Sequence, residues 1–124
     1  MVLGVGVDLL KVERIEKICT KNEARFADKI LSALELQDYQ LAINKIDFLA
    51  KRFAVKEAVS KALGTGMAQG VSWKHMTLSH SELGQPRVTL IDAAQARFAF
   101  LGAHSLHVSL SDDAGFVSAY AVIS

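Results

Sequence analysis

The sequence of 124 residues has only one cysteine and one proline, and it has no marked excess of charge of either sign. Because Cys19 has no partner in the chain, an intrachain disulfide and a Cys-x-x-Cys metal site are both excluded. The 14 basic and 13 acidic residues leave a net charge of +1, so the chain lacks the basic excess of a nucleic-acid-binding protein. These features are typical of a protein from a reducing compartment.

Long apolar runs are also missing. No uninterrupted run approaches the roughly 20 residues that a membrane-spanning helix requires. The apolar segment Met1–Leu10 has no basic region and no small-residue cleavage site, so it is not typical of a secretion signal. We therefore expect a cytoplasmic protein that does not bind membranes. The length and the 51% hydrophobic content indicate one compact domain over residues 1–124.

The hydrophobic pattern predicts strands near both ends of the chain, with most of the helices between them. The expected helices cover Lys11–Cys19, Glu23–Ile30, Ala33–Ile43, Asp47–Leu63 and Asp92–Leu101. The expected strands cover Val2–Leu10, Trp73–Ser79, Arg87–Leu90, Leu106–Leu110 and Phe116–Val122. Ser32, with Glu35 three residues later, has the spacing of a capping box, and Asp112–Gly115 is typical of a hairpin turn. This order predicts an α+β fold with helices packed on a small, mostly antiparallel sheet.

The expected helix over Asp47–Leu63 has two unusual faces. Alanines at every fourth position gather on one side, where another backbone can approach closely, and ordinary packing against the sheet is the simplest explanation. These alanines are Ala50, Ala54, Ala58 and Ala62. Arg52 and Lys56 project into the apolar arc of the same helix. They either extend to solvent or need anionic partners, because a buried unpaired charge is unfavourable.

Basic residues recur three or four positions apart in the first helical region and so gather on one face. They are Arg14, Lys17, Lys21, Arg25 and Lys29. A solvated face with local ion pairs is the simplest interpretation. Docking of an acidic protein is the alternative, because such a stripe steers association. Binding to a membrane surface is less favoured, since the opposite face carries only scattered apolar residues.

Several common catalytic motifs are absent. Gly4 and Gly6 are not followed by the third glycine of a dinucleotide fingerprint, and no Gly-x-Ser-x-Gly sequence occurs. The four histidines lack the spacing of zinc ligands. Gly64 and Gly66 follow a helix rather than precede one, so phosphate bound near them would need a cation such as Lys61.

Two carboxylates stand in unusual places. Asp8 lies near the end of an apolar strand, and Glu57 lies on a helix that is otherwise apolar and basic. Glu57 and Lys61 are four residues apart and can form an ordinary helix ion pair, worth about 0.3–0.5 kcal/mol. The residue pattern alone leaves both an ion pair and a functional site open.

Two segments resemble the signatures of bacterial holo-[acyl-carrier-protein] synthases, the short trimeric type within the 4′-phosphopantetheinyl transferase superfamily. They are Gly6–Arg14 (GVDLLKVER) and Arg52–Gly66 (RFAVKEAVSKALGTG). The family pattern is G-x-D-x-x-x-x-x-R followed by F-x-x-K-E-A-x-x-K-A-x-G-x-G, and every fixed position is present. Ile30–Glu35, Gly84–Pro86 and the His-Val-Ser sequence at His107 also resemble the family. One departure is Asp112, where many members have histidine.

The resemblance implies an α+β fold of the 4′-phosphopantetheinyl transferase type and a specific activity. Members transfer the 4′-phosphopantetheine group of coenzyme A to a serine of apo-acyl carrier protein, in support of fatty acid biosynthesis, and release 3′,5′-ADP. It implies Mg²⁺ held by Asp8 and Glu57, with coenzyme A as the substrate. It also implies a homotrimer whose sites lie between subunits.

The resemblance also implies roles for individual residues. Lys61 would contact phosphate, and the remaining coenzyme A contacts would come from Gly64, Gly66, Pro86 and His107. Glu35 is a candidate general base, with Glu57 acting through a water as the alternative. Carrier docking would fall to Arg14, Lys21 and Arg25.

Two alternatives stay open. The first is a non-catalytic module that binds an acidic protein through its basic first helix. The second is a transferase of the same class that serves carriers of polyketide or peptide synthesis.

Overall fold

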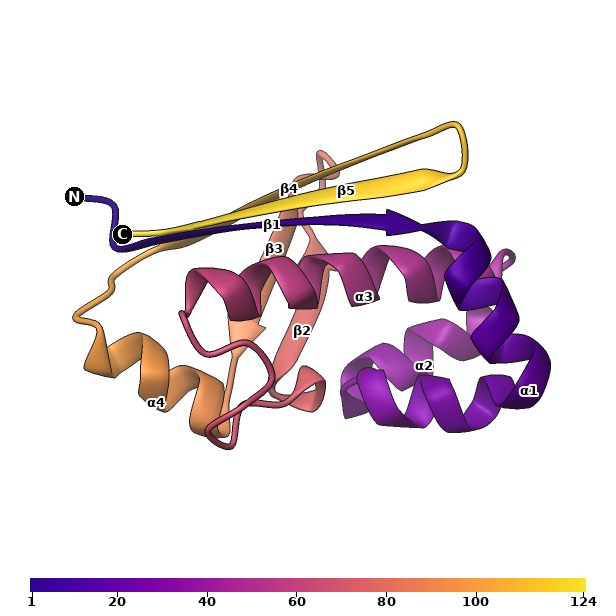
Figure 1. Cartoon of the computed structure of the whole chain (residues 1–124), viewed down its shortest axis with the longest axis horizontal. Helices are drawn as coiled ribbons and strands as arrows, with labels where there is room; N and C mark the ends of the chain where they lie inside the picture. The colour runs from indigo at the N-terminus through magenta and orange to yellow at the C-terminus, as the bar shows by residue number, and fades with distance from the viewer.

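The computed structural model describes all residues, 1–124, and has an α+β architecture, as the order of elements predicted. In chain order the elements are β1 (Gly4–Lys11), α1 (Val12–Ile30), α2 (Ala33–Leu41), α3 (Lys45–Ala62), the 3₁₀ turn η1 (Trp73–His75), β2 (Met76–His80), β3 (Pro86–Leu90), α4 (Asp92–Phe100), β4 (Leu106–Asp113) and β5 (Phe116–Ile123). An antiparallel sheet has the order β1-β5-β4, and β2 pairs with β3 in a separate hairpin. Figure 1 shows α3 running along one face of the three-stranded sheet, with α1 and α2 at one end of α3.

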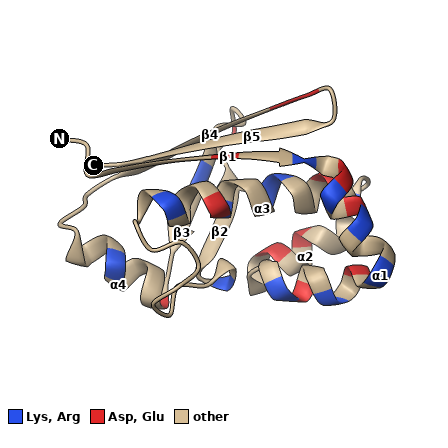
Figure 2. Ribbon diagram, viewed as in Figure 1, with Lys and Arg blue, Asp and Glu red and all other residues tan.

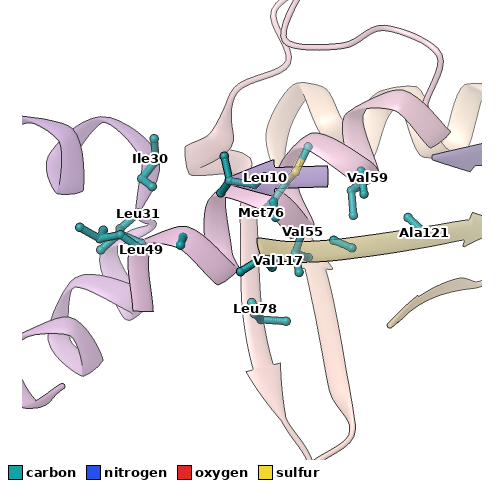
Figure 3. Close-up of a cluster of buried hydrophobic side chains, with 14 of the residues drawn as sticks. Leu10, Ile30, Leu31, Leu49, Val55, Val59, Met76, Leu78, Val117 and Ala121 are labelled. Atoms are coloured by element: carbon teal, nitrogen blue, oxygen red, sulfur yellow. The ribbon is translucent and has the colours of Figure 1, made fainter. Parts of the chain in front are cut away.

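The core lies between α3 and the inner face of this sheet (Figure 3). Every second residue of β5 is buried, which is the alternation expected of a strand with one covered face. Val55 and Val59 of α3 pack in the same cluster. No helix of the structure combines the length and the apolar character needed to cross a membrane.

The contact between β1 and α3 is made by backbone. A Cβ atom on Gly4 would lie 2.0 Å from the carbonyl oxygen of Ala62, and one on Gly6 would lie 1.9 Å from that of Ala58. The alanine face of α3 is fully covered at these positions. The interpretation of the alanine ladder as packing against the sheet is therefore confirmed, and the glycines of β1 are what allow the close approach.

Helix α1 is kinked at Asn22, which has φ −164° and ψ 91° and is its one non-helical residue. The two helical segments predicted on either side of residues 20–22 are the two halves of this helix. The capping box at the start of α2 is present as predicted, because the Ser32 side chain accepts from the Glu35 backbone and the Glu35 side chain accepts from the Ser32 backbone.

Two predicted strand boundaries were wrong by three residues each, and the others differ by two residues or fewer. The strand expected from Trp73 starts at Met76, because Ser72 caps the 3₁₀ turn η1, which covers Trp73–His75. The last hairpin turns at Ala114 and Gly115 alone, both with positive φ, so Asp112 and Asp113 belong to β4. A two-residue turn with positive φ at both positions matches the twist of the strands, which explains why the ladder continues further than predicted.

Candidate functional site

Asp8 and Lys61 meet where β1 crosses α3. Successive residues of a strand point to opposite faces of the sheet, so Asp8, two residues after Gly6, faces the helix as Gly6 does. The Lys61 Nζ lies 3.3 Å from the Asp8 Oδ1, and it donates a hydrogen bond of 2.8 Å to the carbonyl oxygen of Val7. Lys61 is thus paired with Asp8 and not with Glu57, so the simple helix ion pair considered for Glu57 is not formed.

Glu57 is half-buried, one turn before Lys61 on α3. The pKa of its carboxyl is raised, chiefly because burial disfavours the charged form and further because Asp8 carries like charge. The positive charges of Lys61 and Arg14 oppose this rise. The structure therefore brings Asp8, Glu57, Lys61 and Arg14 into one electrostatic environment. Two carboxylates that repel each other at the surface do not stabilise a fold, and such pairs are typical of functional sites.

The donor set fits a magnesium ion. Mg²⁺ is commonly held by one or two carboxylates and completes its shell with water and substrate phosphates. No group of three or more His, Cys, Asp or Glu side chains forms a metal site made of protein alone. Asp8 and Glu57 would supply the two carboxylates, and their mutual repulsion is the kind that a bound cation relieves.

Gly64 and Gly66 lie just beyond the C-terminal end of α3, one turn from Lys61. Both have positive φ, 80° and 59°, which explains the glycines at these positions. A Cβ atom on Gly66 would meet nothing within 4 Å, so the backbone there borders open space. A ligand that contacts Lys61 has room to lie against this loop.

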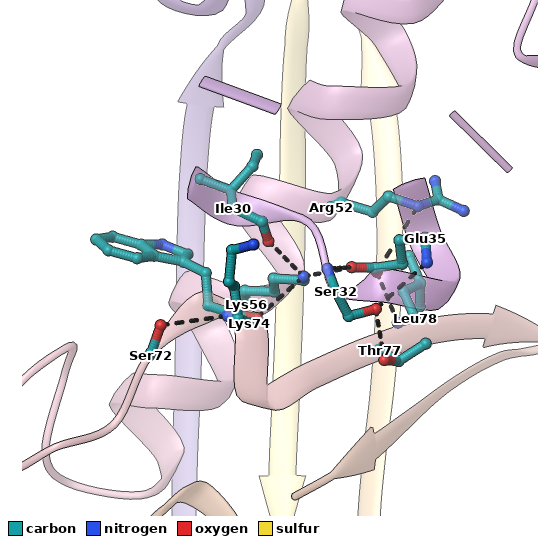
Figure 4. Close-up of polar contacts among 10 residues, drawn as sticks. Ile30, Ser32, Glu35, Arg52, Lys56, Ser72, Lys74, Thr77 and Leu78 are labelled. Carbon is teal, nitrogen blue, oxygen red and sulfur yellow. Dashed lines mark hydrogen bonds and ion pairs between the residues drawn. The ribbon is translucent and has the colours of Figure 1, made fainter. Parts of the chain in front are cut away.

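Glu35 is in a different place, at the centre of a buried polar network (Figure 4). It is 0% exposed, as is Lys56, and the Lys56 Nζ lies 2.5 Å from the Glu35 Oε1. Lys56 also donates to the carbonyl oxygens of Ile30 and Trp73, at 2.6 and 3.1 Å. The network therefore joins the end of α1, the start of α2, the middle of α3 and the turn η1.

The other carboxylate oxygen of Glu35 is also occupied. It accepts a hydrogen bond of 2.9 Å from the Leu78 N–H, and the Arg52 Nε is 3.8 Å away. A general base must come within hydrogen-bond reach of the proton that it accepts, and a buried, fully bonded carboxylate does not meet this requirement. Its burial conflicts with the expected role of Glu35 as the base. Glu35 is the anionic partner that the buried Lys56 requires.

Pro86 lines a pocket of about 520 Å³ that no sequence motif marked as a basic site. Three of its other lining residues are Lys51, Arg52 and His80. The pKa of His80 is lowered, first by burial and then by the positive charges of Arg52 and Lys51. The buried Arg52 Nε has no hydrogen-bond partner. Asp47 also lines the pocket and pairs with Lys51 at 3.0 Å, so the excess of positive charge is small. It suits an anionic ligand, and the one sequence signal for it was Arg52 on an apolar helix face.

Pro86 also lines a smaller pocket of about 410 Å³ between β3 and β4, and His107 lines it too. The structure therefore brings together Pro86 and His107, the two coenzyme A contacts expected beyond the Gly64–Gly66 loop. The basic pocket and the carboxylate pair face different directions. Phe48, Lys51 and Arg52 lie roughly 120–180° around α3 from Glu57, at about 100° per residue.

The outer face of the three-stranded sheet is uncovered, and it is apolar along β1 and β5. Val5, Val7 and Leu9 of β1 are each more than half exposed, and Phe116 and Tyr120 of β5 are also exposed. Figure 1 shows no helix on this side of the sheet. Contiguous apolar surface of this kind marks an interaction site.

The basic stripe follows α1 away from the carboxylate pair. Figure 2 shows basic segments on both halves of this helix. Arg14 is near enough to Glu57 to influence its pKa, whereas Lys21 and Arg25 line a hollow of about 520 Å³ at the kink. A partner bound along the stripe would therefore lie with one end beside the carboxylates.

Comparison with known proteins identifies a family. The family model of the 4′-phosphopantetheinyl transferase superfamily matches residues 4–121. A holo-[acyl-carrier-protein] synthase from Vibrio cholerae is 41% identical over 123 residues, which are 99% of this chain and 98% of that protein. The crystal structure of the Neisseria meningitidis synthase has a TM-score of 0.94 at 34% identity and covers 100% of this chain and 99% of its own. The Helicobacter pylori synthase in complex with coenzyme A has a TM-score of 0.83 at 33% identity, covering 97% and 99%.

Proposed function

The chain belongs to the 4′-phosphopantetheinyl transferase superfamily, and on this basis we propose how its residues divide the work of the reaction. The enzyme transfers the 4′-phosphopantetheine group of coenzyme A to a serine of apo-acyl carrier protein, giving holo-acyl carrier protein and 3′,5′-ADP. The observation that carries the assignment of roles is the meeting of Asp8, Glu57 and Lys61 at the crossing of β1 and α3. The proposed setting is the cytoplasm, and the proposed pathway is fatty acid biosynthesis.

Asp8 and Glu57 hold Mg²⁺ in this proposal. A bound ion would supply positive charge at the pyrophosphate of coenzyme A, where the bond to be broken lies. Lys61 is half exposed and already oriented by its contacts with Asp8 and Val7, so it can direct an N–H toward a phosphate oxygen. Gly64 and Gly66 let the backbone approach the nucleotide beside Lys61, and the backbone at Gly66 borders open space. Phosphoryl transfer of this type depends on positioning and charge neutralisation, and these residues supply both.

The nucleophile is the serine of the carrier, so the enzyme needs no activated nucleophile of its own. The proton of the serine hydroxyl has to go to a group at the phosphate. Glu57, acting through a water, is the acceptor that we propose, because Glu35 is buried in the network with Lys56.

A homotrimer with coenzyme A between neighbouring subunits is the proposed assembly. Its support is geometric, because the basic pocket at Pro86 faces away from the Asp8–Glu57 pair of the same chain. A neighbouring copy would bring its own Pro86, Arg52 and His107 to the nucleotide. The uncovered apolar face of the sheet offers the surface on which the copies would pack.

Carrier docking is proposed for Arg14, Lys21 and Arg25. These residues lie on the stripe that starts beside Glu57, so an acidic carrier bound along α1 would present its serine near the carboxylate pair. Carriers of polyketide or peptide synthesis have the same reactive serine and are tested beside the fatty acid carrier.

The test is the mass of an apo carrier protein after incubation with the enzyme, coenzyme A and Mg²⁺. The expected result is a gain of one phosphopantetheine on the fatty acid carrier and no gain when the metal is chelated. A second readout is independent of activity: Mg²⁺ should raise the unfolding temperature of the wild-type enzyme but not of Asp8→Asn. No mass gain on any of the carriers would contradict the proposed function.

A further inference from the structure

The kink in α1 creates a concave surface that a straight helix does not have. Asn22 has extended backbone angles in the middle of the helix, and the hollow of about 520 Å³ lies at this point. The residues that line it are Lys17, Ile18, Lys21, Asn22, Arg25, Phe26 and Lys29. Four of them are cations, two are apolar and none is acidic.

The side chain of Asn22 holds the kink. Its Oδ1 accepts a hydrogen bond of 3.0 Å from the backbone N–H of Arg25, which makes Asn22 the N-cap of the second half of α1. Near the end of the first half, the Thr20 hydroxyl donates to the Glu16 carbonyl oxygen at 2.9 Å. The φ of −164° is extended backbone that any residue can adopt, so a substitution at Asn22 removes the cap without relieving or adding backbone strain.

The second half of α1 is fixed from its other side. Phe26, Ala27 and Ile30 are buried in the core, and the Ile30 carbonyl oxygen accepts from Lys56. The cap at Asn22 therefore sets the direction in which the first half leaves this anchored segment. It also sets how Lys21, before the kink, is placed relative to Arg25, after it.

Lys21 and Arg25 are available to a partner. Neither takes part in an ion pair within the chain, whereas Lys17 pairs with Glu13 at 3.0 Å and Lys29 lies over the Trp73 ring. Two unpaired cations beside the exposed apolar side chain of Ile18 match a helix that carries a carboxylate next to an apolar residue.

We propose that Asn22 is a positioning residue for carrier binding, because its cap holds open the hollow that receives an acidic helix of the carrier protein. This inference rests on the proposed function and deepens it. In the Asn22→Ala variant the helix gains from continuing without a break, since alanine is the best helix former and a poor N-cap. The docking-competent kink is then populated less, and the apparent affinity for the carrier falls by the same fraction.

The experiment compares Asn22→Ala with Asn22→Ser, because serine is an N-cap comparable to asparagine. Steady-state transfer is measured with carrier and coenzyme A varied separately. We expect Asn22→Ala to raise the carrier KM about fivefold, the fold-change that corresponds to losing one capping interaction. The kcat and the coenzyme A KM should change by less than about twofold, since the kink lies away from the carboxylates. Asn22→Ser should restore the carrier KM.

Two further variants separate the possible failures. Thr20→Ala loses a side-chain hydrogen bond two residues before Asn22 on the same helix and should leave all three parameters unchanged. Arg25→Glu reverses a charge in the hollow and tests docking itself. A normal carrier KM in Asn22→Ala with a raised one in Arg25→Glu overturns the positioning role but leaves the docking surface standing. A normal carrier KM in both variants overturns the docking proposal as well. An equal rise of both KM values in Asn22→Ala, or failure of serine to rescue, shows general damage and also overturns the inference.

Discussion

Replacing Gly6 with alanine tests the contact that brings β1 to α3. A Cβ atom there would lie 1.9 Å from the Ala58 carbonyl oxygen and 2.8 Å from the Ala62 nitrogen, and both are backbone atoms that cannot rotate away. An ordinary contact begins at 3.4 Å, so relief requires a separation of 3.4 − 1.9 = 1.5 Å between strand and helix. Asp8 is two residues further along β1 and would be carried away from Lys61 by a similar amount.

A shift of this size affects stability and activity differently. We expect Gly6→Ala to lose about 1–3 kcal/mol of unfolding free energy, the usual range for inserting a methyl group into a packed core. We expect kcat/KM to fall about 100-fold, because a displacement near 1 Å at a phosphoryl-transfer site has an effect of this size. Urea unfolding and steady-state transfer to the carrier measure the two quantities.

A matched control separates the displacement from the loss of stability. Gly102 has positive φ, 72°, which Gly6 does not, and a Cβ atom there meets nothing within 4 Å. Gly102→Ala should therefore lose about 1 kcal/mol through backbone strain alone and keep its activity. If Gly6→Ala retained kcat/KM within twofold of the wild type, the reasoning that the glycine contact places Asp8 would be refuted.

Two other predictions concern the buried and half-buried charges. Glu57 has a raised carboxyl pKa in the folded state, so the folded protein binds its proton more tightly and the contribution of Glu57 to stability falls as the pH rises through that pKa. Glu57→Gln should therefore unfold at a higher temperature than the wild type near pH 7 without Mg²⁺, with no such advantage below about pH 4. A variant less stable than the wild type at pH 7 would show that burial and the charge of Asp8 do not outweigh the positive charges of Lys61 and Arg14. Glu35→Gln leaves Lys56 buried without a counter-ion and should lose about 3–5 kcal/mol in urea unfolding, and adding Lys56→Met should recover most of it. A loss below about 1 kcal/mol in the single variant would contradict the structural role of this pair.

Local sequence patterns were sufficient for the elements of the fold. Period and caps located the helices, the break near Asn22 and the capping box at Ser32, because each depends on residues within a few positions of one another. The turn predicted over Asp112–Gly115 was two residues too long, since the extent of a ladder depends on the facing strand.

The candidate site was less accessible to local reasoning. Glu35 and Lys56 are 21 positions apart, and their pairing arises only when α2 packs on α3. The four-residue spacing of Glu57 and Lys61 indicated an ion pair between them. Because β1 approaches α3 closely, Lys61 pairs with Asp8 instead. The basic pocket around Arg52 combines residues from α3, the β2–β3 hairpin and β4, so no single stretch of sequence carries it. The residue patterns around Asp8 and around Glu57 did not indicate that the two carboxylates belong to one site. That prediction came from the resemblance to the family.

The central claim is that the Asp8–Glu57 pair holds the metal at which the phosphopantetheine group is transferred. The most direct measurement is the mass of an apo-acyl carrier protein incubated with coenzyme A, Mg²⁺ and either the wild-type enzyme or Glu57→Gln. The wild type should convert the carrier to the holo form, whereas the folded Glu57→Gln variant should leave its mass unchanged. Full conversion by Glu57→Gln would contradict the claim and remove Glu57 from the site.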